Sequence, residues 1–403
     1  MFGGKAVAAR SEARTGHDGR VRPRYKTGMR IVILGAGPAG LYLAYLVKRR
    51  DRAATVTVIE QNPADATFGF GVVFSDRALD FLRDQDEATY AAIVPHMESW
   101  TDMTLCLRGE RIVIDGIGFA AISRLKLLQL LQVQAHSVGV VAVYGRSVKS
   151  LDELPAHDLL VGADGVNSLV RRTYADAFGA QVTHLTNRFA WFGTTKRFET
   201  LTQTFVETSE GAFNAHHYRY APDSSTFIVE TDASTFARMG FADMPEVEAR
   251  RTCERIFAAT LDGHPLISNN SIWRRFPIVR NKRWSYGPCV LVGDALHTAH
   301  FSIGSGTRLA MEDAIALDKS LAAHPGNIPS ALAAYEAVRR PVLEKLVAGA
   351  NGSAEWYEHF AQHMKLAPAE FAMSYITRSG RVDRERLRRL SPRFVARYEL
   401  GST

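Results

Sequence analysis

Short apolar runs recur at wide intervals along the chain. Four of them are rich in Ile, Val and Leu and too short for helices, so they predict buried parallel strands at residues 30–34, 55–59, 159–163 and 289–293. Segments 41–50 and 125–135 have helical composition, and the first ends in basic residues. Strand, helix and strand follow one another between residues 30 and 59, which predicts a βαβ unit of an α/β sheet.

The pattern changes between about residues 186 and 274, where aromatic and polar residues alternate. The stretch Phe189-Ala-Trp191-Phe shows this alternation, which is typical of antiparallel strands with one buried face. We predict a second domain here, with a helix over 246–259 lying on its sheet. From residue 309 onward the composition is helical, and we expect a helix over 328–346 and a separate helical segment from residue 353.

Composition narrows the class of protein. The chain has 403 residues, 46% of them hydrophobic and 23% charged, which is typical of a folded protein with two domains. It contains no apolar run long enough to span a bilayer and no readable secretory signal, so we expect a cytoplasmic protein without a membrane partner. Three widely separated cysteines, without metal-ligand spacing, predict neither a disulfide framework nor a metal site; they are Cys106, Cys253 and Cys289.

The net charge of +7 is concentrated at the two ends of the chain. Residues 1–28 hold seven basic residues against two acidic ones, and residues 378–397 hold eight arginines against two acidic residues. The remainder is slightly acidic, so we expect no nucleic-acid partner. We interpret residues 1–28 as a disordered extension.

A glycine pattern typical of dinucleotide binding follows the first predicted strand. It reads Gly35-Ala-Gly37-Pro38-Ala39-Gly40, and Glu60, followed by Gln61, stands at the end of the next strand. The three glycines permit a tight turn, the approach of a pyrophosphate and close helix–strand packing. The helix N-terminus offers N–H groups to phosphates, and Glu60 can accept hydrogen bonds from a ribose. This pattern alone does not distinguish NAD from FAD.

Two further motifs decide between the cofactors. Gly162-Ala-Asp164-Gly165, leading to Arg171, follows one predicted strand, and Gly293-Asp294-Ala-Leu-His297 follows another, with Gly304-Ser305-Gly306 and Met311-Glu-Asp313 behind it. With the glycine pattern, in this order and at these separations, they give a chain that resembles the single-component FAD-dependent aromatic hydroxylases of the para-hydroxybenzoate hydroxylase type. The resemblance covers residues 29 to about 347, and it implies FAD as cofactor and NADH or NADPH as electron donor.

The resemblance implies a role for several residues. Asp294 is expected to bond the ribityl chain of FAD, Asp164 to lie on the surface that faces FAD and NAD(P)H, and Arg124 to contact the flavin at the start of a helix. Gly71, in the stretch Gly69-Phe-Gly71, is assigned to the cofactor site. The turn and helix start that should lie against the isoalloxazine and the pyrophosphate are Gly304, Ser305, Gly306 and Thr307. A helix N-terminus there favours the negative charge of reduced flavin.

The same resemblance implies the fold class, which is α/β. We expect a Rossmann-like FAD-binding domain of the glutathione reductase type over residues 29–185 and 275–350. An antiparallel-sheet substrate domain is inserted at residues 186–274, and residues 351–403 form a C-terminal helical segment. Such proteins form homodimers in some cases, which makes a homodimer compatible with the resemblance.

The stretch from Thr298 to Gly304 departs from the general family pattern, which has a proline after Gly-Asp-Ala-x-His. With Gly69 to Ser75 and His216-His-Tyr218, it resembles the branch that contains salicyloyl-CoA 5-hydroxylase, the N-terminal half of 2-aminobenzoyl-CoA monooxygenase/reductase and the tryptophan hydroxylase of violacein biosynthesis. This implies hydroxylation of an aromatic CoA thioester with O2 through a C4a-hydroperoxyflavin, with salicyloyl-CoA to gentisyl-CoA as the first expectation. One alternative is a hydroxylase of a free aromatic such as a tryptophan derivative. Another is a non-hydroxylating flavin-binding redox or sensor protein.

Candidates for catalysis and substrate binding follow from residue chemistry. His300 and His216 could handle the proton of a substrate hydroxyl, since imidazole titrates near neutral pH. Arg275 and Arg378, with other arginines between 378 and 389, could bind the phosphates of CoA. The aromatic residues that could line a dry pocket are Trp191, Phe213, Tyr218 and Phe301. Each has a structural alternative: a satisfied core histidine, a core aromatic residue, or a solvated helix face.

Overall fold

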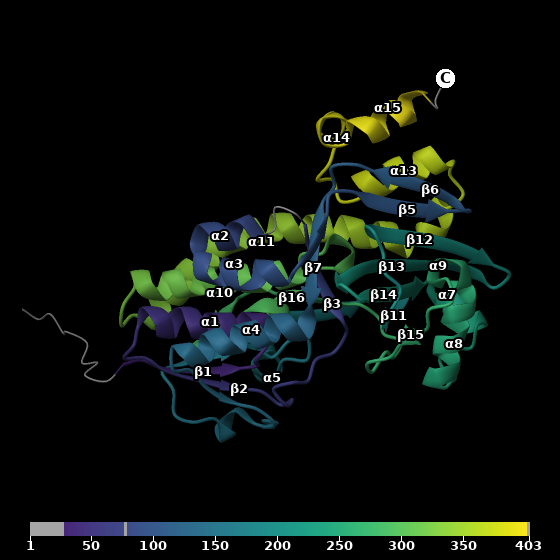
Figure 1. Ribbon diagram of the computed structural model, residues 1–403. Coiled ribbons are helices and arrows are strands. Elements are labelled where there is room, and N and C mark those ends of the chain that lie inside the picture. Colours follow the sequence, from purple (N-terminus) through teal and green to yellow (C-terminus); the bar gives the residue numbers. More distant parts are fainter. Residues whose placement is uncertain (1–27, 76–78, 401–403) are drawn as a thin grey trace, which may run out of the picture.

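The computed structural model describes residues 28–75 and 79–400. The predicted extension over 1–28 lies, apart from Gly28, outside these residues. Two sheets and a group of long helices form the framework, and the two sheets lie at opposite sides of Figure 1. The α/β fold class predicted from the sequence is confirmed.

A six-stranded sheet carries the first domain. The four predicted strands all belong to it, and the parallel pairs β1·β2, β1·β9 and β9·β18 place their carboxyl ends at one edge. Its order is β17 (Ser285–Tyr286), β18 (Cys289–Leu291), β9 (Leu159–Gly162), β1 (Arg30–Leu34), β2 (Thr55–Ile59) and β8 (Val141–Val143). Because its central strands are buried on both faces, they read as continuous apolar runs.

Helices cover this sheet. The first helix is buried from Ala39 to Val47, and three basic residues end it, which suits the negative end of the helix dipole. The predicted helix over 125–135 is confirmed. The helices of this region are α1 (Pro38–Arg50), α2 (Asp80–Gln85), α3 (Glu87–Ile93), α4 (Arg124–Ser137), α5 (Leu169–Thr173), α6 (Ala175–Phe178), α10 (Gly306–Ala323) and α11 (Ile328–Glu358). None of the helices in residues 28–75 and 79–400 is long and apolar enough to cross a membrane.

The helix α11 is continuous over 31 residues, so the prediction of a separate segment beginning at residue 353 is wrong. Gly349 and Gly352, near the end of α11, do not end the helix but allow close packing against it. A Cβ atom on Gly349 would lie 2.9 Å from Nε of Arg381, and one on Gly352 would lie 3.1 Å from the carbonyl oxygen of Arg378. Glycine is used here because a distant part of the chain approaches the helix backbone.

A seven-stranded sheet carries the second domain, and it is larger than predicted. Its order is β15 (Leu266–Ile267), β11 (Arg188–Thr194), β14 (Ser224–Thr231), β13 (Gly211–Ala221), β12 (Leu201–Thr208), β5 (Met103–Leu107) and β6 (Glu110–Ile114). The last two strands come from the segment assigned to the FAD-binding domain. Met103 pairs with Leu201 in a parallel ladder, and no local pattern reveals a pairing over that separation.

Two small sheets join the domains. The strands β10 (Ala180–His184) and β16 (Pro277–Asn281) pair antiparallel just before and just after the second domain. The other sheet has the order β3 (Gly71–Ser75), β7 (Phe119–Ser123) and β4 (Glu98–Trp100), and it contacts β13 of the large sheet.

Both faces of the seven-stranded sheet are covered. One face packs against α7 (Ala233–Arg238), α8 (Glu246–Ile256) and α9 (Ala258–Leu261) through Phe213, Phe227 and Phe257. The predicted helix over 246–259 is thus two consecutive helices. The other face packs against the end of α11 and against α12 (Phe360–His363), α13 (Pro368–Thr377), α14 (Arg384–Leu390) and α15 (Pro392–Leu400). These C-terminal helices stand at the top of Figure 1, beside β5 and β6.

Candidate active site

The turn between β1 and α1 leaves an open space beside Gly37. Gly35 has a φ angle of +105°, and a Cβ atom there would lie 2.3 Å from the carbonyl oxygen of Ala163. A Cβ atom on Gly40 would lie 2.0 Å from the carbonyl oxygen of Gly35, so packing requires glycine at both positions. Beside Gly37, no atom lies within 4 Å of a Cβ position. The start of α1 is therefore open to an anionic ligand.

Glu60 lies beside this turn, at the end of β2. Its Oε2 accepts a hydrogen bond from the backbone N–H of Ala36 at 2.8 Å, and its Oε1 accepts from Asn62. Gln61 is exposed. Glu60 thus holds the position next to the glycine turn where a ribose hydroxyl is predicted, while neither it nor Gln61 lines the large cavity described below.

Asp294 follows β18 in a short 3-10 turn (Gly293–Ala295), and its carboxylate faces a large cavity. Its depth in the protein raises the pKa of this carboxyl, against the opposing effects of His297 and Arg124. Arg124 begins α4 on the same cavity wall, and its Nε atom is buried without a hydrogen-bond partner. Burial lowers the pKa of Arg124, which Asp294 partly offsets. Within the described residues neither side chain has an ion-pair partner within 4 Å, so both are available to a ligand.

Asp313 fixes the loop that carries Asp294. From the buried face of α10, its Oδ2 accepts hydrogen bonds from the backbone N–H of Gly293 at 3.1 Å and from Nε2 of His297 at 2.7 Å, and its Oδ1 accepts from Nε of Arg339 at 2.8 Å. Burial alone would raise the pKa of Asp313, but His297 and Arg339 lower it below its usual value. Asp313 belongs to the motif Met311-Glu-Asp313, but its contacts with the Gly293–His297 loop are visible only in the structure.

One cavity of about 1480 Å³ connects the glycine-rich motifs of the first domain with the seven-stranded sheet of the second. It is larger than the roughly 300–1,000 Å³ of a typical small-molecule pocket, so it has room for a dinucleotide and a second ligand. Gly37, Pro38 and Ala39 line one part, together with the turn and the start of α10 from Gly304 to Thr307. The eighteen-residue helix α10 thus directs its positive end into the cavity.

Aromatic side chains line the part of the cavity that faces the large sheet. Trp191, Tyr218 and Phe301 belong to this lining, as predicted. The hydroxyl of Tyr218 donates to the carbonyl oxygen of Gly71 at 3.0 Å, which ties the substrate sheet to the cofactor-side strand β3. The indole N–H of Trp191 is buried without an acceptor. This end of the cavity is therefore largely apolar, with an unused hydrogen-bond donor.

Phe213 does not line the cavity, so its assignment to the substrate pocket is corrected. It packs in the core on the opposite face of the sheet, where its ring lies 6.4 Å from that of Phe241. Side chains alternate between the faces of a strand, so Phe213 and His216, three residues apart on β13, point to opposite sides. This alternation could have excluded Phe213 once His216 was placed in the pocket.

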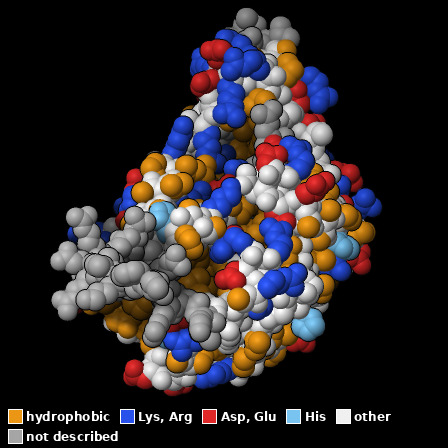
Figure 2. Space-filling view, turned by 90° about the vertical axis from the view of Figure 1, so that its left-hand side faces the viewer, with side chains coloured by type: hydrophobic (Ala, Val, Ile, Leu, Met, Phe, Trp, Pro, Cys, Tyr) orange, Lys and Arg blue, Asp and Glu red, His pale blue; other side chains and the backbone are white. Residues whose placement is uncertain are grey.

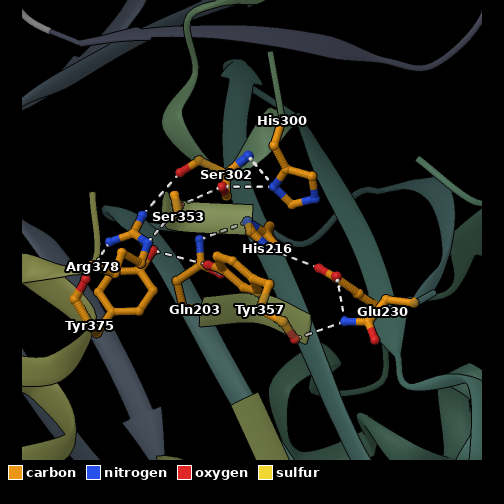
Figure 3. A network of polar contacts seen from close by, with 10 residues as sticks. Gln203, His216, Glu230, His300, Ser302, Ser353, Tyr357, Tyr375 and Arg378 are labelled. Atoms are coloured by element: carbon orange, nitrogen blue, oxygen red, sulfur yellow. Dashed lines mark hydrogen bonds and ion pairs between the residues drawn. The ribbon is translucent and has the colours of Figure 1, made fainter. Parts of the chain in front are cut away.

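Figure 3 shows a polar network that contains His216, His300 and Glu230. Nε2 of Gln203 donates to Nδ1 of His216 at 3.0 Å, while Oε1 of Gln203 accepts from the hydroxyl of Tyr357. The remaining nitrogen of His216, Nε2, therefore carries the hydrogen, and it lies 3.7 Å from Oε2 of Glu230. Burial raises the pKa of Glu230, and burial lowers the pKa of His216 to about 3.

The second arm of the network contains His300. Its Nδ1 lies 2.8 Å from Oγ of Ser302, which is bonded to Oγ of Ser353, and this in turn accepts from Nε of Arg378 at 2.9 Å. Burial lowers the pKa of His300 to about 4, against the opposing effect of Glu230. His216 lines the cavity, but His300 does not. Both imidazoles are neutral at physiological pH. The Glu230 carboxyl lies near His216 and also raises the pKa of His300.

Comparisons with solved structures agree with this architecture. The chain superposes on the tetrameric form of 2-methyl-3-hydroxypyridine-5-carboxylic acid oxygenase with a TM-score of 0.66, covering 88% of this chain and 96% of that one at 17% identity. A probable FAD-dependent monooxygenase from Pseudomonas aeruginosa, pqsL, gives the same TM-score, with 21% identity over 87% of this chain and 100% of that one. At these identities the likeness concerns the fold.

Sequence comparisons define the family. The profile of an FAD binding domain matches residues 123–350. A salicyloyl-CoA 5-hydroxylase of a Streptomyces species is 42% identical over 361 residues, which cover 87% of this chain and 70% of the relative. The chain belongs to the FAD-dependent aromatic monooxygenases. A 3-hydroxy-4-methyl-anthranilyl-[aryl-carrier protein] 5-monooxygenase of Streptosporangium sibiricum is 37% identical, covering 82% of this chain and 89% of the relative.

The residues of this monooxygenase fit FAD. Its cavity offers the open backbone at Gly37 for a pyrophosphate, the free carboxylate of Asp294 for hydroxyl groups, and the orphaned Nε of Arg124 for a flavin oxygen. Gly306 adds open space at the start of α10, where no atom lies within 4 Å of a Cβ position. The expected FAD cofactor agrees with these features.

Two predicted polar residues also bond within the protein. Oδ2 of Asp164 accepts from the backbone N–H of Leu169 at 2.6 Å and so caps α5, while its Oδ1 is buried without a hydrogen-bond partner and its neighbours from Gly165 to Asn167 line the cavity. Arg275 lines the cavity but donates to the carbonyl oxygens of His184 and Leu185.

Proposed function

We propose that this monooxygenase uses NADH or NADPH and O2 to hydroxylate the ring of an aromatic CoA thioester, with salicyloyl-CoA to gentisyl-CoA as the first candidate. The observation that carries the proposal is the single cavity that joins three environments. These are the FAD motifs, an aromatic end with Trp191 and Tyr218, and a mouth lined by arginines of the C-terminal segment.

Two relatives support a thioester. Their names specify a salicyloyl group on CoA and an anthranilyl group on an aryl-carrier protein, and both specify position 5 of the ring. In a salicyloyl group this carbon lies para to the hydroxyl, so it is electron-rich and suited to accept an electrophilic oxygen. In the proposed reaction one oxygen atom of O2 replaces a ring hydrogen as hydroxyl and the other leaves as water, with two electrons from NAD(P)H.

Bound FAD supplies the electron transfer and the activation of O2. The protein positions the ring and excludes water, a task for which the apolar side chains of Trp191, Tyr218 and Phe301 are suited. The unused N–H of Trp191 is a donor for a substrate oxygen. His216, oriented by Gln203, handles the proton of the substrate hydroxyl.

Glu230 lies beside this histidine. Because Nε2 of His216 already carries a hydrogen, Nδ1 is the nitrogen that takes the proton of the substrate hydroxyl, in place of the hydrogen bond from Gln203. The Glu230 carboxylate, with Oε2 3.7 Å from Nε2, stabilises the imidazolium ion that forms. His300 lowers the pKa of Glu230 and is bonded to Ser302 through Nδ1, but it does not line the cavity. The sequence assigned the two histidines but not the carboxyl, whose partners are all distant in the chain.

The test begins with the visible spectrum of the purified protein. NADH and NADPH consumption and product mass are then measured in parallel with salicyloyl-CoA, salicylate attached to a carrier protein, free salicylate and tryptophan. We expect a yellow protein that forms a product with one added oxygen only from the CoA thioester. Turnover of a free aromatic alone would contradict the thioester, and consumption of NAD(P)H without any oxygenated product would contradict hydroxylation.

A further inference from the structure

The loop after α13 and the helix α14 form one wall of the cavity mouth. Arg378, Arg381, Arg386 and Arg389 line the cavity from this segment, and Arg308 lines it from α10. Asp294 is the only acidic residue among the described residues that line the cavity, and it belongs to the FAD loop. Figure 2 shows basic side chains gathered on the upper lobe, which carries α14, and around the hollow below it.

Some of these arginines form ion pairs with carboxylates, and others do not. Arg308 pairs with Glu312 at 2.7 Å, and Arg389 pairs with Glu385 at 2.6 Å on the exposed face of α14. Arg381 and Arg386 instead donate to backbone carbonyl oxygens, those of Leu346 and Arg381. Neither has a carboxylate within 4 Å in the part of the chain that the structure describes. Burial, together with Arg308 and Arg386, lowers the pKa of Arg381, as expected where positive charges face one another.

Arg378 is less suited to bind a ligand than the sequence indicated. Its guanidinium donates to the carbonyl oxygens of Ser302 and Tyr375 and to Oγ of Ser353, and it stacks on the ring of Tyr375 at 3.7 Å. Arg386 and Arg389 are exposed, and Arg381 is half-buried. The side chains of Arg386 and Arg389 are thus the more accessible from solvent, and Arg381 is the less accessible of the three.

The helix that carries these arginines is held in place. Oδ1 of Asp383 accepts from the backbone N–H of Arg386 at 2.7 Å and so caps α14. Leu387 is buried in the hydrophobic cluster that covers the large sheet. Asp115, the residue after β6, accepts a hydrogen bond from the backbone N–H of Phe394 at 2.8 Å. The arginines therefore project from a fixed support and not from a loose tail.

We propose that Arg381, Arg386 and Arg389 bind the phosphate groups of CoA, while the pantetheine arm runs through the cavity and the aryl group reaches the aromatic end. The inference rests on the proposed function and deepens it. Three arginines, two of them without a carboxylate partner, match the diphosphate and the 3′-phosphate of CoA better than the single phosphodiester of a carrier protein. An uncharged free aromatic would leave them without a ligand.

The experiment compares FAD-loaded wild-type protein with the double variant Arg386→Gln and Arg389→Gln. The KM is measured for salicyloyl-CoA and for salicyloyl-pantetheine, which lacks the phosphates, and the Kd of CoA alone is measured by calorimetry. Arg384→Gln is the matched control, because Arg384 is exposed on the same helix and does not line the cavity. Since both substituted side chains are exposed, the fold should be retained, which circular dichroism checks.

We expect the double variant to raise the KM for salicyloyl-CoA and the Kd of CoA at least about ten-fold, and to leave the KM for salicyloyl-pantetheine unchanged. An unchanged Kd of CoA, or an equal rise in KM for both thioesters, would overturn the phosphate site. If the variant weakens CoA binding but wild-type protein hydroxylates no thioester, the proposed function fails and the phosphate site stands. Turnover restricted to a carrier-protein thioester would overturn the assignment to CoA.

Discussion

The guanidinium of Arg378 donates a hydrogen bond to the backbone carbonyl oxygen of Ser302, with the two atoms 3.0 Å apart. Ser302 lies in the short turn before α10, whose start lines the cavity at the FAD end. Through this contact the C-terminal segment supports the loop that leads into the cofactor site.

We predict that Arg378→Ala destabilises the protein by about 2–4 kcal/mol, because several charged hydrogen bonds are lost at once. The loss should also weaken FAD retention, since the turn at Ser302 is no longer held from outside. Urea unfolding and FAD release on gel filtration measure the two effects. Arg378→Lys should restore them only in part, since an ammonium group cannot reproduce the guanidinium fork. A variant with wild-type stability and FAD content would show that the contact is dispensable.

Substitution of Gly37 should impair FAD binding, whereas substitution of Gly40 should lower the stability of the fold. Gly37→Val places a side chain in open space beside the start of α1, so we expect a folded protein that has lost most of its FAD. Gly40→Ala forces a Cβ atom against the carbonyl oxygen of Gly35, so we expect loss of stability itself. Absorbance at the flavin bands and the unfolding midpoint separate the two outcomes. A Gly37→Val protein that keeps its full FAD content would exclude this turn as the phosphate site.

Asp313→Asn should be among the most damaging single changes. It leaves the buried guanidinium of Arg339 with one acidic partner fewer and removes the acceptor of His297, so we expect a loss of about 3–5 kcal/mol in unfolding free energy. Asp318→Asn on the same helix breaks a partly exposed pair with Arg50 and should cost about 1 kcal/mol or less. Equal effects of the two substitutions would contradict the special role of Asp313.

Stability should fall as the pH drops from about 7 to 5. His216 and His300 stay neutral in the folded protein, where burial lowers their pKa values to about 3 and about 4, but they take up a proton near pH 6.5 when the chain unfolds. Because the unfolded state then binds more protons, each histidine costs up to about 2 kcal/mol at pH 5. Urea unfolding across this range should show a flatter profile for His300→Asn than for the wild type. Parallel profiles would refute this assignment.

Glu230→Gln tests the proton pathway. Glutamine keeps the size of the side chain but has no negative charge to stabilise the His216 imidazolium ion, so we expect kcat with salicyloyl-CoA to fall about 100-fold and its pH dependence to change. Burial raises the pKa of Glu230, so the folded state disfavours its ionised form. Above the ordinary pKa of glutamate, Glu230→Gln should therefore have a larger free energy of unfolding than the wild type. Unchanged kcat and pH profile would leave Glu230 without a role in proton transfer. Glu358→Gln, which changes another carboxyl bonded at Asn187, is the control.

The sequence by itself determined the cofactor half of this protein. Gly35, Gly37 and Gly40 lie within one strand–turn–helix unit, and Asp294 lies three residues after a buried strand, so short patterns sufficed to predict their local structure. The strands that carry them were predicted because a strand buried on both faces is apolar throughout. The family followed from the order and spacing of these local motifs.

Only the tertiary structure decided the rest. The strand β5 joins β12 from almost a hundred residues away, Arg378 reaches Ser302, and Asp313 binds the Gly293–His297 loop, contacts that leave no periodic trace in the sequence. The face on which Phe213 lies depends on which side of its strand the cofactor domain covers. Such features arise from packing between distant segments, and a local pattern of apolar and polar residues reports only that a side chain is buried, not what buries it.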